Sequence, residues 1–202
     1  MSNSAPLTPR SSPGSTPSAH VAQTCPLEAF TRIAAFISGA SFDLLMGVLS
    51  VKTKDQLQAK LAHVNPSTVW IQPSISLTAK CQLIHNWLQQ YGRRVAASKD
   101  VIPLALILLI RFTVEAHNKD EQLEFDEGVW TVVAIKTAYG NSSDEWLALE
   151  TWEERTGVPK ATIKKAELRF LEILDWRTWI GEKVFTDLGQ RMAILWDIAL
   201  KD

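Results

Sequence analysis

Two charged side chains stand in stretches that are otherwise apolar. Lys136 is the only charged residue between Glu127 and Asp144, and an ammonium group buried without a partner carries a large desolvation cost. Its long side chain therefore either extends to solvent or meets an anionic or carbonyl partner. Glu167 lies one helical turn after Ile163, at the edge of an apolar face. Its carboxylate needs a cation or backbone N–H donors.

Two interpretations of these residues stay open. Lys136 and Glu167 could form an internal ion pair, which says little about stability because desolvation offsets the attraction. Alternatively, they are polar groups set in an apolar surface, which is the usual composition of a specific docking surface. Neither interpretation involves breaking a covalent bond.

The remaining residues show no pattern typical of catalysis. No Gly-rich phosphate loop and no nucleophile motif is present, and the four histidines lack the spacing of metal ligands. We therefore expect a protein that is not an enzyme, with no metal, cofactor or small-molecule ligand. Cys25 and Cys81 are expected to be reduced thiols. The histidines are His20, His63, His85 and His117.

Charge and hydropathy exclude two classes of partner. The formal net charge is -1, whereas nucleic-acid binding normally needs a basic excess or stripe. The longest apolar run, residues 101–110, has about half of the ~20 residues that span a bilayer. We expect neither a nucleic-acid nor a membrane partner. The N-terminus lacks the apolar segment of a secretory signal, which predicts a nuclear or cytoplasmic location.

The hydrophobic pattern predicts helices throughout the chain after residue 25. Apolar residues recur at helical spacing, and signals for strands or hairpins are weak. The predicted helices cover about 26–39, 42–51, 55–64, 83–91, 100–117, 129–139, 159–174 and 182–200. The helix at 129–139 is apolar nearly all round, which is typical of a central buried helix. The acidic stretch at 120–127 is expected to be a solvated connection.

Composition divides the chain into three parts. Residues 1–25 are rich in Ser, Thr and Pro and hold one charged residue, Arg10, which predicts a disordered tail. Residues 26–77 are expected to form an N-terminal helical extension. Residues 78–202 are expected to form a compact bundle of five helices joined by short connections. The tail contains three Ser-Pro or Thr-Pro pairs: Thr8-Pro9, Ser12-Pro13 and Thr16-Pro17. They are either phosphorylation sites for a proline-directed kinase or pairs that any tail of this composition contains by chance.

The stretch from about residue 80 to 185 resembles the cyclin box, most closely that of the fungal PCL-type cyclins of the phosphate system. The resemblance rests on the segments QLIHNWLQQYG, IPLALILLIRF, VVAIKTAYGN and TWEERTGVPKATIKKAELRFLEILDW. It implies an all-α fold, with a five-helix cyclin box preceded by the helical extension and the tail. It also implies that Lys136 and Glu167 are the polar centre of the kinase-binding face.

Three positions depart from the cyclin pattern. Many cyclins have a buried arginine in the first box helix and an aspartate in the second, where this chain has Cys81 and Ile110. Replacement of both partners of a buried ion pair by apolar groups can be neutral for stability, so these two differences are compatible with a cyclin-box fold. Thr137 stands where an aromatic residue commonly follows the lysine, which affects the shape of the docking face.

The resemblance implies a regulatory subunit that binds and activates a cyclin-dependent protein kinase. Like the PCL-type cyclins, the chain would need only one box. The alternative is a cyclin-fold adaptor or scaffold that binds other proteins without activating a kinase.

Overall fold

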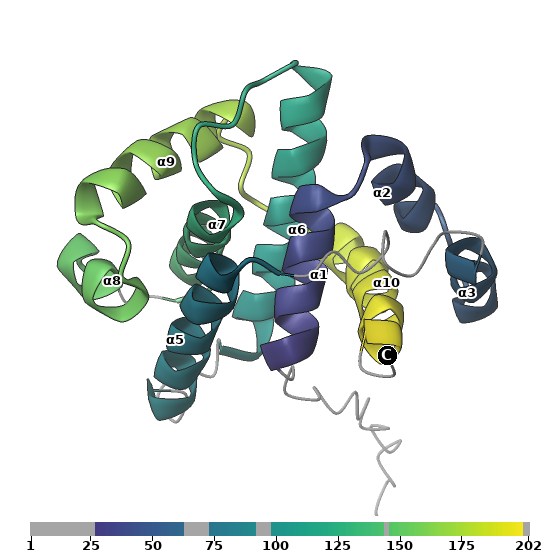
Figure 1. The fold of residues 1–202 in the computed structure, drawn as a ribbon, viewed down its shortest axis with the longest axis horizontal. Coiled ribbons are helices and arrows are strands. Elements are labelled where there is room, and N and C mark those ends of the chain that lie inside the picture. Colours follow the sequence, from purple (N-terminus) through teal and green to yellow (C-terminus); the bar gives the residue numbers. More distant parts are fainter. Residues whose placement is uncertain (1–26, 63–72, 92–97, 144–145, 200–202) are drawn as a thin grey trace, which may run out of the picture.

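The computed structural model describes residues 27–62, 73–91, 98–143 and 146–199. The predicted disordered tail, residues 1–25, lies outside these ranges. All regular structure in the described residues is α-helical, so the predicted all-α fold class is confirmed (Figure 1). The helices are α1 (Leu27–Gly39), α2 (Phe42–Leu49), α3 (Lys54–Ala62), α5 (Ile75–Tyr91), α6 (Ser98–Asn118), α7 (Glu127–Ser142), α8 (Leu149–Thr156), α9 (Lys160–Ile173) and α10 (Glu182–Ala199).

Helix α7 lies at the centre of the bundle, as its pattern predicts. It packs against α6 most extensively, and also against α5 and α9. Every residue from Gly128 to Ile135 is buried, because the helix meets neighbours on several sides and has few polar side chains to present to water. Helix α7 therefore fixes the positions of the surrounding helices relative to one another.

Two aromatic clusters lock α7 in place. Trp87 of α5 and Trp152 of α8 meet edge to face with ring centroids 5.2 Å apart, and Tyr139 of α7 lies 5.6 Å from Trp87. On another side, Phe112 of α6 lies 4.6 Å from Phe170 of α9 and 4.7 Å from Trp130 of α7. Such pairs stabilise a core beyond the area they bury.

Helix α1 belongs to the same core as the later helices. It packs on α5, α6 and α10, and its residues 29–31 and 33–37 are buried. Phe36 of α1 and Leu109 of α6 are members of one continuous hydrophobic cluster. The predicted boundary at residue 77 lies within α5, and the segments on its two sides share this core. The division of the chain into these parts stays a prediction.

Helix α6 is the one helix of the described residues that combines great length with a strongly apolar sequence. Its segment Val101–Asn118 is long and apolar enough to cross a membrane by length and composition alone, and half of that segment is buried inside the fold. Residues from Leu104 to Ile110 are all buried against α1, α7 and their neighbours. In this structure α6 is a core helix.

The connection 119–126 is fastened to α9, and so is less free than the expected solvated connection. Glu121 forms an ion pair with Arg169, and Glu124 forms one with Lys165 at 2.6 Å. Lys165 also lies 5.6 Å from the centroid of the Phe125 ring. The alternating charges of this stretch therefore attach the connection to the charged face of α9.

Candidate functional site

The structure brings Lys136 and Glu167 together. Lys136 extends from the middle of α7 and Glu167 from the middle of α9, and the ammonium group donates to carboxylate Oε1 in an ion pair. The side chains are 13% and 25% exposed, respectively. The pair is thus half-buried at the seam between two packed helices, with one edge open to solvent.

Local packing explains why these two side chains meet. The face of α9 that turns inward carries Ile163, Ala166 and Phe170, at the helical spacing that defines a buried stripe. Glu167 follows Ala166 and so lies at the border of that stripe. Lys136 follows Ile135, which is fully buried. Each charged group lies at the edge of an apolar contact between α7 and α9, and the opposite charge of the other residue compensates it.

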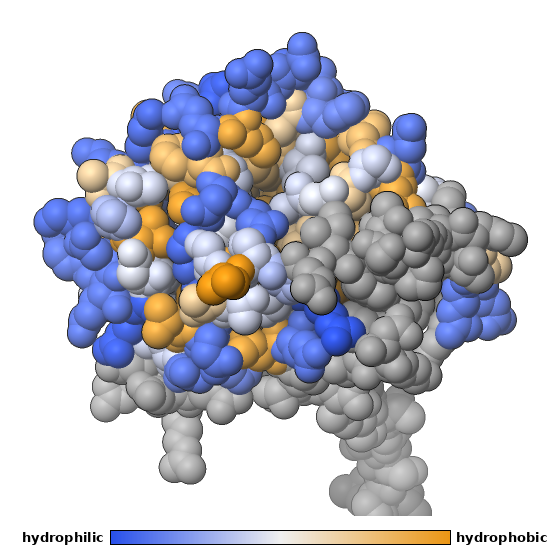
Figure 2. Space-filling view, viewed as in Figure 1, coloured by the Kyte–Doolittle hydropathy of each residue, from blue (hydrophilic) through white to orange (hydrophobic). Residues whose placement is uncertain are grey.

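The surroundings of the pair are partly apolar. Leu168, the residue after Glu167, is half-exposed, and Leu171 one turn later is partly buried. The hydroxyl of Thr137 is buried and has no hydrogen-bond partner among the residues that the structure describes. On the face shown in Figure 2, apolar residues over α8 and α9 are interspersed with polar ones.

The ion pair leaves hydrogen-bonding capacity unused. A lysine ammonium has three donors and a carboxylate has about four acceptor sites, and the Lys136–Glu167 contact uses one of each. The remaining donors of Lys136 can bind carbonyl oxygens of a partner. The remaining lone pairs of Glu167 can accept from backbone N–H groups. The arrangement is therefore suited to recognising a polypeptide backbone.

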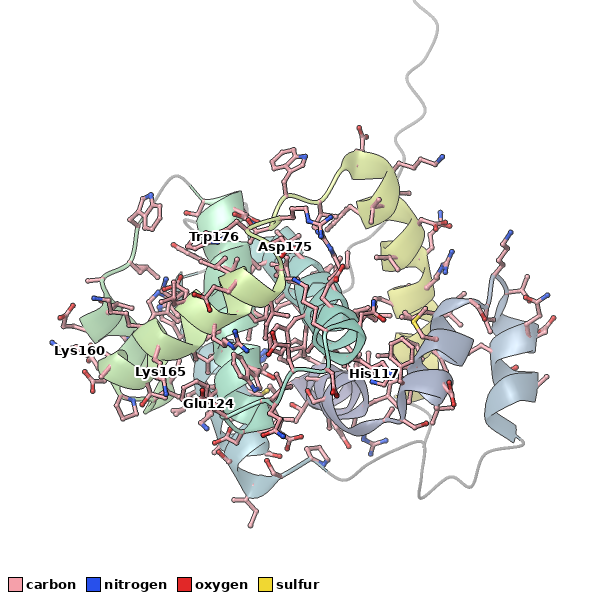
Figure 3. The ribbon with its side chains drawn as sticks, turned by 90° about the horizontal axis from the view of Figure 1, so that it is seen from above. His117, Glu124, Lys160, Lys165, Asp175 and Trp176 are labelled. Atoms are coloured by element: carbon pink, nitrogen blue, oxygen red, sulfur yellow. The ribbon has the colours of Figure 1, made fainter. Side chains whose placement is uncertain are left out.

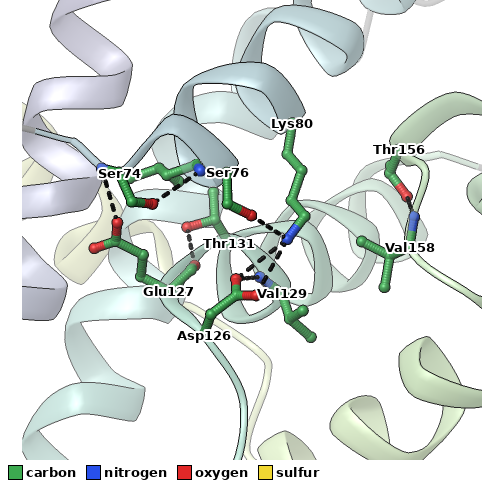
Figure 4. A network of polar contacts seen from close by, with 10 residues as sticks. Ser74, Ser76, Lys80, Asp126, Glu127, Val129, Thr131, Thr156 and Val158 are labelled. Carbon is green, nitrogen blue, oxygen red and sulfur yellow. Dashed lines mark hydrogen bonds and ion pairs between the residues drawn. The ribbon is translucent and has the colours of Figure 1, made fainter.

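A separate polar network fixes α5 against α7 (Figure 4). The Asp126 side chain caps α7 by accepting from Val129 N at 3.0 Å. Lys80 of α5 donates to Asp126 Oδ1 at 3.2 Å. Glu127 accepts from the backbone N–H of Ser74 at 3.1 Å, and the Ser74 hydroxyl accepts from Leu77 N. The two helix N-termini are thus joined by shared caps.

Gly128 permits this close approach. A Cβ atom at Gly128 would lie 2.8 Å from Cδ and 3.1 Å from Nζ of Lys80, so a side chain there would displace the lysine. The network holds α7, and therefore Lys136, in register with α5. Sequence reasoning did not identify these residues. A signal was available, because Asp126 directly precedes an apolar helix and is a favoured N-cap type.

Cys81 and Ile110 are both buried, at 1% and 3% exposure. Cys81 borders a small cavity that Leu27 and Ile102 also line. Burial raises the pKa of its thiol from 9.0 to about 12, and a hydrogen bond with Thr31 of α1 partly opposes this shift. Helix α1 therefore supplies a hydrogen-bonding neighbour for the buried thiol of α5.

Two exposed tryptophans were not recognised as functional candidates from the sequence. Trp176 and Trp179 lie in the connection between α9 and α10 and are 61% and 80% exposed. The sequence shows them only as residues that end a helical pattern. The available signal was the presence of two tryptophans in a stretch without apolar periodicity, where no core helix is expected to bury them.

Comparisons with models of protein families, with curated proteins and with solved structures found no match to this chain. In the described ranges, no three His, Cys, Asp or Glu side chains come together as metal ligands would. The site is therefore interpreted from its own geometry.

Proposed function

We propose that this chain is a single-box, cyclin-type regulatory subunit that binds and activates a cyclin-dependent protein kinase. The observation that carries the proposal is the half-buried Lys136–Glu167 pair on α7 and α9. The resemblance of the sequence to the cyclin box assigns these two residues to the kinase-binding face. Their unused donors and acceptors suit that role.

The proposed mechanism is a shift of the kinase toward its active conformation. Phosphoryl transfer by protein kinases requires an ion pair between a lysine on strand β3 and a glutamate on helix αC. A subunit that binds αC only in its active position stabilises that conformation by differential affinity. Lys136 would bind carbonyl groups near the start of αC, and Glu167 would accept from backbone N–H groups. This chain contributes no catalytic group.

The substitution Lys136→Glu tests the docking role. It places a carboxylate against carbonyl groups of the kinase, and disruption of a buried polar contact at an interface costs about 2–5 kcal/mol, which is a loss of roughly thirty-fold or more in affinity. The measurement is co-purification with candidate cyclin-dependent kinases, with circular dichroism as the control for folding. Lys165→Glu is the matched control, because Lys165 is an exposed lysine of α9 that pairs with Glu124.

The exchange Lys136→Glu with Glu167→Lys separates docking from an internal structural role. It can restore the ion pair with its charges reversed, so thermal stability should return toward that of the parent. Kinase binding should remain lost, since both groups then face backbone atoms of the wrong polarity. If the exchanged protein binds and activates the kinase like the parent, the pair is only structural. Binding of a kinase without activation would favour the adaptor function instead.

A further inference from the structure

The connection between α9 and α10 presents two tryptophans to solvent. Trp176 and Trp179 are among the most exposed large apolar side chains of the described residues. Tryptophan usually buries most of its large apolar surface, and exposed apolar area of this kind marks interaction sites. The two indoles are therefore candidates for contact with a partner.

The surrounding structure holds this connection in place. Lys119 donates to Ile173 O at 2.8 Å and to Asp175 Oδ1 at 2.7 Å, and these contacts fasten the end of α9 to the end of α6. Arg111 donates to Trp179 O at 3.3 Å, and Asn141 to Thr178 O at 3.1 Å. Contacts from α6, from α7 and from Lys119, the residue after α6, thus position the end of α9 and the segment that follows it.

The backbone at the end of α9 is strained. Asp175 and Trp176 have φ angles of 50° and 60°, in the left-handed region that residues with a Cβ atom avoid. The N–H of Trp176 donates to Leu171 O at 2.8 Å and closes the helix. Figure 3 shows Asp175 and Trp176 at this end of α9, with Lys160 and Lys165 toward its other end. Strain of this kind persists where surrounding contacts enforce it.

Exposed aromatic rings on a backbone that is held in place suit a proline-rich ligand. Polyproline II segments dock on aromatic surfaces with little loss of conformational entropy, because the segment is already extended. The sequence contains two prolines at a matching spacing in Pro6-Leu7-Thr8-Pro9. In a polyproline II helix, with three residues per turn, Pro6 and Pro9 would lie on one edge, about 9 Å apart. Trp176 and Trp179 are also three residues apart, so their Cα atoms are separated by at most about 11 Å.

The chain that joins the two parts is long enough. Leu27, where α1 begins, lines one cavity with Ile102 of α6, and Ile102 lies about 14 Å along α6 from Arg111. Arg111 in turn reaches Trp179. The residues from Pro9 to Leu27 have a root-mean-square span of about 23 Å if they behave as a flexible linker. A linker that matches the distance gives a local concentration in the millimolar range, so even a weak contact would form.

We propose that residues 6–10 of this chain dock on Trp176 and Trp179 within the same molecule. Pro6 and Pro9 contact the two indoles. Arg10, the one charged residue among the first 25, faces the exposed Glu182 at the start of α10. This contact is independent of the proposed kinase-binding role.

Nuclear magnetic resonance of the indole N–H groups tests the proposal in the full chain. Trp176→Phe and Trp179→Phe assign the two signals. The double substitution Pro6→Ala with Pro9→Ala should shift both signals. Pro13→Ala with Pro17→Ala is the matched control, since these prolines are four residues apart and do not share one edge of a polyproline II helix. It should leave both signals in place, and dilution should change neither.

Three results would overturn the proposal. Both indole signals could stay unchanged in the Pro6 and Pro9 variant, which would mean that the segment does not contact them. The two double variants could shift the signals equally, which would mean that proline spacing is irrelevant. The signals could move with protein concentration, which would assign the surface to a second copy of the chain.

Discussion

The thiol of Cys81 lies in an environment that favours its protonated form. Burial is the main cause of its raised pKa of about 12, and the Thr31 hydrogen bond acts in the opposite direction. In the unfolded chain the thiol would have its ordinary pKa of about 9.0. Between these two values the folded protein keeps a proton that the unfolded chain has lost.

The free energy of unfolding should therefore fall as pH rises from about 9 toward 12. The contribution of Cys81 is fully present below the unfolded pKa and is lost toward the folded pKa, with a slope of about 1.4 kcal/mol per pH unit. Urea unfolding of the parent and of Cys81→Ala across this range measures the effect. The alanine variant should lack this part of the slope. Parallel curves for the two proteins would mean that the thiol is not protected by burial.

At the scale of single residues, the sequence shows which charged side chains require a compensating group, but it shows less well which residue provides that group. A lone lysine in an apolar helix and a glutamate beside an apolar stripe each require compensation, so both could be identified in advance. An ion pair between Lys136 and Glu167 is one of the two interpretations of the sequence, and the structure contains this ion pair. The Ser74–Glu127 contact joins residues 53 positions apart, and no periodicity indicates such a contact.

The joined N-termini of α5 and α7 stabilise both elements. Each helix end has backbone N–H groups without intrahelical partners, and the carboxylates of Asp126 and Glu127 lie where the helix dipoles are positive. Asp126 serves twice, because it caps α7 and also binds Lys80 of α5. Loss of this one carboxylate affects two helices.

Asp126→Ala should destabilise the protein more than an ordinary capping substitution. Loss of an N-cap typically costs about 1 kcal/mol and up to about 2 kcal/mol, and Lys80 here also loses its carboxylate partner. Asp43→Ala is the control, because Asp43 lies in the first turn of α2 while Ser41 provides that cap. Chemical denaturation of both variants gives the comparison. Equal losses would show that the junction adds nothing beyond the helix dipole.

Most helices could be predicted because their signals are local. Apolar spacing depends on neighbouring residues, and the predicted helix at 129–139 lies within α7, which extends further at both ends. The attachment of 119–126 to α9 could not be predicted in the same way. Alternating charges in a connection are compatible with full solvation, and the partner Arg169 is 48 residues from Glu121.

For the molecule as a whole, the position of α1 determines whether the chain unfolds as one cooperative unit or as two. Phe36 of α1 is 1% exposed and is part of the cluster that includes residues of α6 and α7. Two segments that share a core are expected to unfold together.

Phe36→Ala should therefore lower the unfolding midpoint reported by tryptophan fluorescence. Seven of the eight tryptophans lie at residue 87 or later, so the fluorescence signal reports mainly the helices beyond the N-terminal extension. A buried Phe→Ala substitution typically costs about 3–5 kcal/mol. Met46→Ala in α2 is the control, because that side chain is 40% exposed and should change the midpoint little. An unchanged midpoint for Phe36→Ala would mean that residues 26–77 unfold independently.

The close pairing of α6 with α7 has a consequence for how the chain reaches this structure. These helices make the most extensive contact of any pair, and only the connection 119–126 separates them along the chain. A short connection costs little loop-closure entropy, and local contacts favour fast folding. Helix α1 must find the same core from far along the chain. We therefore expect the α6–α7 pair to form the folding nucleus and α1 to complete the core afterwards.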